Sequence, residues 1–162
     1  MNSDHFTPKR LTRRYTQTVE ASPERVFPLL CPVREEDWLD GWRYRMIRSE
    51  SGLVEEGAVF STPGAGEPDT VWIVTRHDPA SHVVEFTRFT HESRVCVLRI
   101  AVRPKDEGHA LVDIAYTYTA TSPAGNAFIE EGFTEAAFLG AVTFWERSMN
   151  HWLATGERLP KV

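Results

Sequence analysis

The stretch Val19-Glu20-Ala21-Ser22-Pro23-Glu24-Arg25-Val26-Phe27 joins a strand-like segment to a helix-like one. Pro23 suits a first helical position because no N–H donor is needed there, and Ser22 can accept hydrogen bonds from the free N–H groups of the first turn. A strand is expected over residues 13–20, with Tyr15, Gln17 and Val19 on one of its faces. A strand that runs directly into a short helix is therefore expected near the start of the chain.

Two short helices and a series of strands follow this junction. Pro28 and Pro32 limit the first helix, and a second one is predicted over residues 35–40, ending at Gly41. Between residues 42 and 120 the polarity alternates with period two, and turn signals separate the runs. The predicted strands are 42–49, 58–62, 70–76, 82–90, 94–103 and 110–120. Because the connections are short, consecutive strands should pair as antiparallel hairpins.

The last forty residues have helical periodicity. Ser122-Pro123 begins a short helical segment that we expect to break at Gly132. Thr134 is a candidate N-cap for a long helix over residues 135–154 that Gly156 ends. One stripe of this helix is apolar, and its members are Phe138, Val142, Trp145, Met149, Trp152 and Leu153. The stripe needs a partner, and the predicted sheet offers the large apolar surface.

Composition limits the class of protein. The chain has 162 residues, 41% of them hydrophobic and 25% charged, with a net charge of -5. This is typical of one globular domain, expected over residues 13–162 after a flexible tail of residues 1–12, and the acidic balance argues against a nucleic-acid partner. Cys31 and Cys96 form no disulfide framework, and neither a signal peptide nor an apolar run of about 20 residues is found. We expect a soluble, cytoplasmic protein without stable membrane insertion.

The chain resembles the SRPBCC superfamily, which includes START domains, polyketide cyclases and birch-allergen-like proteins. The resemblance is carried by residues 19–27, Gly57-Ala58-Val59-Phe60, Val71-Trp72-Ile73-Val74 and the terminal amphipathic helix. It implies an α+β helix-grip fold, in which a curved seven-stranded antiparallel sheet wraps around a long C-terminal helix, with two short helices after the first strand. The superfamily includes lipid carriers, cyclases and chaperone activators, so the resemblance specifies fold better than function.

Alternation along the strands predicts which side chains line a cavity between sheet and helix. We expect Val112, Ile114, Tyr116 and Tyr118 to point inward from one strand, and Cys96, Leu98, Ile100 and Val102 from its neighbour. The candidate ligand-binding residues are Trp42, Tyr44, Phe60, Trp72, Phe86, Arg88, Leu98, Tyr116, Tyr118, Phe138, Val142, Trp145 and Met149.

Arg88 is the most informative candidate because a buried guanidinium needs an anionic or carbonyl partner. It has the same parity as Phe86 and should point inward. The partner is either an acid of the chain, such as Glu135, or an anion of a ligand; a third alternative is that the strand end exposes Arg88 to solvent. Glu36 and Asp37 are interpreted as solvated surface charges.

No motif for a metal, a cofactor or a nucleophile is found. The function favoured by the sequence is binding of a hydrophobic or aromatic small molecule, lipid-like or polyketide-like, without catalysis. A cyclase- or dehydratase-like enzyme and a protein-interaction module of the chaperone-activator type are the alternatives. Ile129, Phe133 and Phe144 lie off the main stripe, where they either pack on the short helices or form a homodimer contact.

Overall fold

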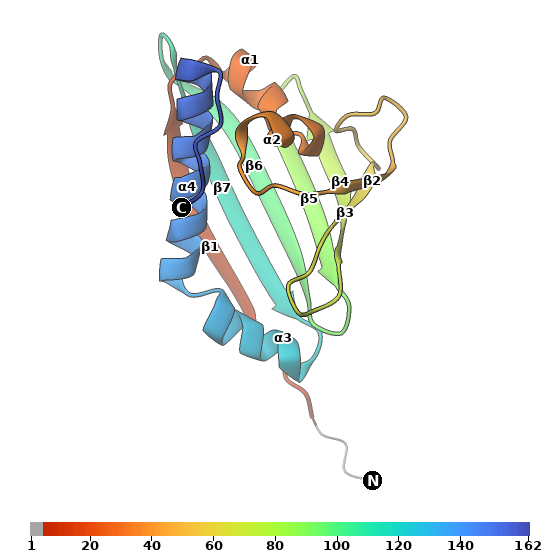
Figure 1. The fold of residues 1–162 in the computed structure, drawn as a ribbon. Coiled ribbons are helices and arrows are strands. Elements are labelled where there is room, and N and C mark those ends of the chain that lie inside the picture. The colour runs from red at the N-terminus through yellow and green to blue at the C-terminus, as the bar shows by residue number, and fades with distance from the viewer. Residues whose placement is uncertain (1–4) are drawn as a thin grey trace.

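The computed structural model describes residues 5–162, and its elements follow the predicted order (Figure 1). The strands are β1 (Arg10–Val19), β2 (Arg45–Arg48), β3 (Val59–Thr62), β4 (Thr70–Asp78), β5 (Val83–Thr90), β6 (Arg94–Asp106) and β7 (His109–Ala120). The helices are α1 (Pro23–Val26), η1 (Phe27–Leu29), α2 (Pro32–Trp38), α3 (Pro123–Ala127), η2 (Phe128–Gly132) and α4 (Glu135–Thr155).

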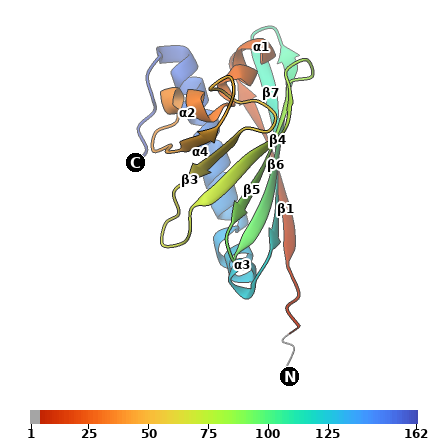
Figure 2. The same cartoon turned by 90° about the vertical axis from the view of Figure 1, so that its right-hand side faces the viewer.

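The strands form one antiparallel sheet in the order β1-β7-β6-β5-β4-β3-β2. Hairpins connect β2 through β7, as the short turns predict, and β1 closes the other edge by pairing with β7 from Arg10↔Thr119 to Val19↔Ala110. The sheet curves, and α4 lies along its concave side (Figure 2). The predicted helix-grip architecture is therefore confirmed.

Several element boundaries differ from the predicted ones. A flexible tail was expected over residues 1–12, but β1 begins at Arg10, so residues 10–12 belong to the sheet. Residues 1–4 of that expected tail lie outside the described chain. α2 covers Pro32–Trp38 rather than the predicted residues 35–40, because a proline is tolerated in the first turn of a helix. β2 covers only Arg45–Arg48, and its pairing with β3 changes register between Met46 and Arg48.

Caps explain where α4 begins and ends. The Thr134 hydroxyl accepts a hydrogen bond from the Ala137 N–H at 3.2 Å. Gly156 ends α4 with φ of 75°, a left-handed conformation that glycine adopts without steric cost. At α1, by contrast, the Ser22 side chain makes no capping bond, so the capping predicted for it is wrong.

Polar contacts fix α4 against β1 at the edge of the sheet. Gln17, fully buried, donates from Nε2 to the Val142 carbonyl at 3.0 Å. Glu146 accepts from the Tyr15 hydroxyl at 2.9 Å and from the Thr18 N–H at 2.6 Å. α4 thus lies towards one side of the concave face, which leaves the surface of β4, β5 and β6 to be covered by other elements. No helix among residues 5–162 is long and apolar enough to cross a membrane.

Candidate functional site

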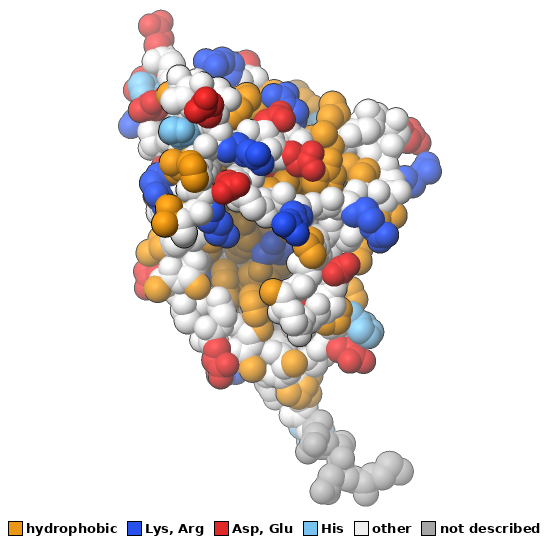
Figure 3. Space-filling view, in the orientation of Figure 1, with side chains coloured by type: hydrophobic (Ala, Val, Ile, Leu, Met, Phe, Trp, Pro, Cys, Tyr) orange, Lys and Arg blue, Asp and Glu red, His pale blue; other side chains and the backbone are white. Residues whose placement is uncertain are grey.

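A cavity of about 270 Å³ lies between α2, α4 and the concave face of the sheet. Its floor consists of sheet residues Phe60, Trp72, Phe86, Leu98, Ile100 and Tyr116. α2 contributes Pro32, Glu35 and Trp38, and α4 contributes Ala141, Phe144 and Trp145. Figure 3 shows a hollow with hydrophobic side chains on its floor, beside α4. The space is therefore not completely filled by aromatic side chains.

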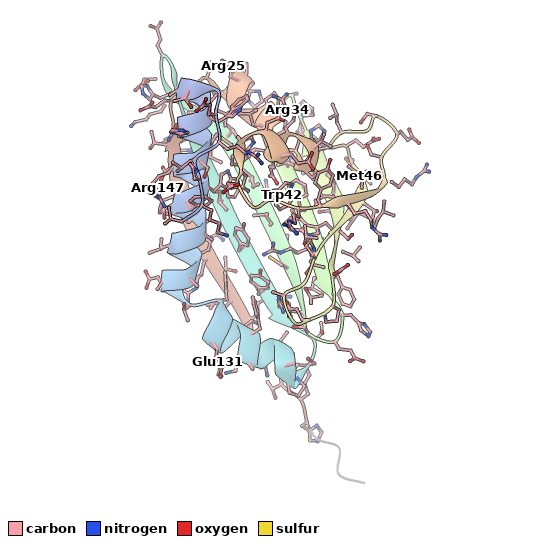
Figure 4. The ribbon with its side chains drawn as sticks, viewed as in Figure 1. Arg25, Arg34, Trp42, Met46, Glu131 and Arg147 are labelled. Carbon is pink, nitrogen blue, oxygen red and sulfur yellow. The ribbon has the colours of Figure 1, made fainter. Side chains whose placement is uncertain are left out.

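Aromatic rings fixed by one another form much of this floor. Trp72 stacks on Phe60 with ring centroids 5.1 Å apart, and it meets Phe86 and Trp42 edge-to-face at 5.8 and 6.1 Å. Its Nε1–H donates to the Thr62 hydroxyl at 2.9 Å. Trp42, labelled in Figure 4, donates in the same way to the Pro32 carbonyl at 2.9 Å. Because their polar atoms are paired within the protein, these rings offer apolar faces to a ligand.

The mouth of the cavity is bordered by the loop after α2 and by the C-terminal segment. Leu39 pairs with Leu159 in an isolated bridge, and the Lys161 N–H donates to the Asp40 carboxylate at 2.8 Å. Asp40, Gly41 and Lys161 all line the cavity. One cationic and one anionic side chain therefore lie at the entrance.

Glu35 places a carboxyl group in the apolar wall. Its side chain is half-buried, and among the described residues it has no hydrogen-bond partner. Burial raises its pKa from 4.5 to about 8, because an apolar environment disfavours the charged form. Near neutral pH this group is thus mostly a carboxylic acid, which can donate a proton in the cavity and can accept one once it has ionised.

Arg88 projects from β5 next to the floor of the cavity. Its guanidinium carbon lies 4.8 Å from the Trp72 ring centroid and 5.2 Å from that of Tyr116, and Nη2 donates to the Tyr118 hydroxyl. Within residues 5–162 no carboxylate lies within ion-pair distance of Arg88, so the predicted partner Glu135 is not its partner. The side chain is half-buried rather than exposed at the strand end.

Arg94 gives a contrast on the neighbouring strand. Both of its terminal nitrogens bind the Glu67 carboxylate, at 2.9 and 2.8 Å, and its guanidinium covers the Phe128 ring at 3.5 Å. Glu67 comes from the loop between β3 and β4, which this pair attaches to β6. Of these two inward-facing arginines, the described part of the chain therefore supplies an acid to Arg94 and none to Arg88.

The two tyrosines beside Arg88 do not supply the missing charge. Burial raises the pKa of Tyr116 and of Tyr118 above the usual value, although the Arg88 cation opposes this effect. Both phenols are therefore neutral at physiological pH, and they offer hydroxyl groups but no anion.

Comparison with solved structures agrees with this architecture. A point mutant of norcoclaurine synthase from Thalictrum flavum superposes with a TM-score of 0.70 at 13% identity, covering 94% of this chain and 99% of that one. The chain has the helix-grip fold. Ara h 8.0201 shares it, with a TM-score of 0.63 at 11% identity, covering 91% of this chain and 99% of that one. So does the Zhui aromatase/cyclase from Streptomyces sp. R1128, with a TM-score of 0.60 at 15% identity, covering 93% of this chain and 100% of that one. No protein-family model and no curated protein sequence matches the chain.

The helix-grip cavity gathers about half of the predicted ligand-binding residues. Those that line it are Trp42, Phe60, Trp72, Phe86, Leu98, Tyr116 and Trp145. Three others, Tyr44, Arg88 and Tyr118, do not line the cavity, but each contacts an aromatic side chain that does.

The other three predicted residues lie further from the cavity, in the packed core. Phe138 and Val142 pack in a second apolar cluster, and Met149 is fully buried in the first. The physical reason is the position of α4 over β1, which uses much of its apolar stripe for packing. Ile129 and Phe133 are buried in the second cluster, while Phe144 lines the cavity, so the three do not share one exposed surface.

Sequence reasoning missed Glu35. Its neighbours Glu36 and Asp37 are exposed, as predicted, and Glu35 itself was given no role. Helical spacing offered a usable signal, because Glu35 lies three residues from both Pro32 and Trp38 and so shares their face. That signal depended on α2 starting at Pro32.

Proposed function

We propose that this protein binds an apolar or aromatic small molecule in the cavity between α2, α4 and the sheet. The supporting observation is the open, aromatic floor around Trp72. Burying apolar surface contributes about 25 cal/mol per Å², so a ligand lying on these rings gains most of its affinity from contact with them. The free, buried Cys31 and Cys96 fit a reducing compartment, and we place this activity in the cytoplasm.

Binding of the neutral fluorophore N-phenyl-1-naphthylamine tests this proposal. We expect enhanced fluorescence and a raised Tm, since a ligand present at about 100 times its Kd stabilises the folded state by about 2.7 kcal/mol. Ala141→Phe should weaken binding because Ala141 is an exposed residue of α4 that lines the cavity. Ala136→Phe, at an exposed position of the same helix away from the lining, is the matched control. Equal binding by both variants, or none by the unmodified protein, would contradict the proposal.

A second candidate function is catalysis of the cyclase type, and Glu35 favours it. A neutral carboxylic acid in an apolar site can protonate a carbonyl oxygen, and the carboxylate that this leaves can then remove a proton from the adjacent carbon, which gives the enol and restores the acid. We expect the protein to accelerate exchange of the methyl protons of 2-acetonaphthone with D2O, measured by NMR. Glu35→Gln should abolish the acceleration and Glu36→Gln should preserve it; an exchange rate unaffected by Glu35→Gln would exclude this role.

A further inference from the structure

Arg88 has hydrogen-bonding capacity that the protein does not use. A guanidinium carries five N–H donors; the Tyr118 hydroxyl accepts from Nη2, and the buried Cys96 thiol is a second hydrogen-bonding partner. Some side-chain polar atoms of the described chain, such as Arg94 Nε, are buried from solvent and have no hydrogen-bond partner, but none of these atoms belongs to Arg88. The N–H groups that bind neither Tyr118 nor Cys96 therefore keep contact with accessible space on the concave face, where Trp72, Tyr116 and Tyr118 surround the guanidinium.

This arrangement is costly unless something compensates for it. Removing a cation from water into an aromatic environment is unfavourable without a partner, and contacts with ring faces recover only part of the loss. The pairing of Arg94 with Glu67 shows that an acid can be supplied from a loop of this fold. At Arg88 the corresponding acid is absent from residues 5–162, and the position adjoins the cavity floor through Trp72 and Tyr116.

We propose that the ligand carries a single carboxylate at one end of an aromatic body, and that this carboxylate pairs with Arg88 while the body lies on the floor around Trp72. The inference rests on the proposed function and specifies the chemical class of its ligand. A carboxylate matches the planar fork of a guanidinium and accepts two parallel N–H bonds from it. The Tyr116 and Tyr118 hydroxyls are further donors for its oxygens.

The charges around the cavity favour a singly charged ligand. Arg88 contributes one positive charge, the two tyrosines contribute none, and Glu35 is largely neutral near pH 7. Asp40 and Lys161 at the mouth carry opposite charges. A doubly charged phosphate would keep one uncompensated charge in an apolar site. The volume of about 270 Å³ falls near the lower limit of ligand pockets, roughly 300 Å³, which favours a body of one or two rings.

Calorimetric titration with 2-naphthoic acid and with its neutral isostere 2-naphthamide, at pH 7, tests the inference. We expect the acid to bind about 10- to 100-fold more tightly than the amide, as a charge-assisted pair requires. Arg88→Met should remove this preference and leave amide binding within about threefold, and Arg88→Lys should retain part of it. Arg99→Met removes an exposed arginine of β6 and is the charge-matched control, for which the preference should persist. The folded state of each variant is checked by its near-UV circular dichroism.

The outcomes separate the inference from the function on which it rests. Equal affinity for acid and amide overturns the inference alone, as does a preference for the acid that survives in Arg88→Met. Binding of N-phenyl-1-naphthylamine without binding of 2-naphthoic acid also overturns it alone. Failure of all three compounds to bind overturns the proposed function and the inference together. If Arg88→Met does not fold, Arg88→Lys tests the inference instead. A preference for the acid equal to that of the unmodified protein would contradict it, because lysine cannot donate two parallel N–H bonds to a carboxylate.

Discussion

Replacing Trp72 by alanine is expected to lower the free energy of unfolding by about 3–5 kcal/mol, the usual cost of deleting a large buried aromatic side chain. Trp72 is 7% exposed and contacts Phe60, Phe86 and Trp42 through its ring. Its loss also removes the ring under Arg88 and a hydrogen bond to Thr62. Urea unfolding should show a lower midpoint with an unchanged m-value, and binding of N-phenyl-1-naphthylamine should fall with it.

Two further variants separate the role of the ring from the general sensitivity of β4. Ile73→Ala changes the next residue, which points to the opposite face and is 41% exposed, so its effect should be well below that of Trp72→Ala. Trp72→Phe keeps an aromatic ring but not the N–H, and we expect an intermediate loss of stability. If Ile73→Ala were as damaging as Trp72→Ala, the special contribution of the cavity floor would be refuted.

The inward-facing side chains of the long strands could be predicted because a period of two leaves little choice. Val112, Ile114 and Tyr118 on β7 and Cys96, Leu98 and Ile100 on β6 are all buried, as alternation predicts. The exact extent of each strand was less predictable. Pairing with β7 includes Arg10 in the sheet, although its side chain is exposed and gives no apolar signal.

The lateral position of α4 could not be deduced from its own pattern. The helix has an apolar stripe, but Gln17, Glu146 and Asn150 determine where it lies, through bonds between residues more than a hundred positions apart. For that reason Phe138, Val142 and Met149 were predicted for the cavity and are found in the packed core. The partners of Arg88 and Arg94 were equally inaccessible to sequence reasoning, since Glu67 reaches Arg94 from a distant loop.

Glu35 gives the stability of the protein a measurable dependence on pH. Its pKa is about 8 in the folded state against an ordinary value of 4.5, so between these values the folded state binds more protons than the unfolded state. The free energy of unfolding therefore falls as pH rises from about 4.5 to about 8 and levels off above that range. At about 1.36 kcal/mol per pH unit, a shift of this size contributes at most about 5 kcal/mol, and contact of the carboxyl group with water in the cavity reduces this figure.

Glu35→Gln should remove this contribution because an amide does not titrate. The variant is expected to be more stable than the unmodified protein at pH 9, while at pH 5 the two should be similar, as measured by urea unfolding across the range. The comparison isolates Glu35 from His77, whose pKa burial lowers from 6.5 and whose titration gives the opposite slope near that pH. Glu36→Gln, at an exposed position of α2, is the control and should keep the pH dependence of the unmodified protein. Identical pH profiles for Glu35→Gln and the unmodified protein would mean that the carboxyl group is solvated, which would also remove the basis for its proposed role in proton transfer.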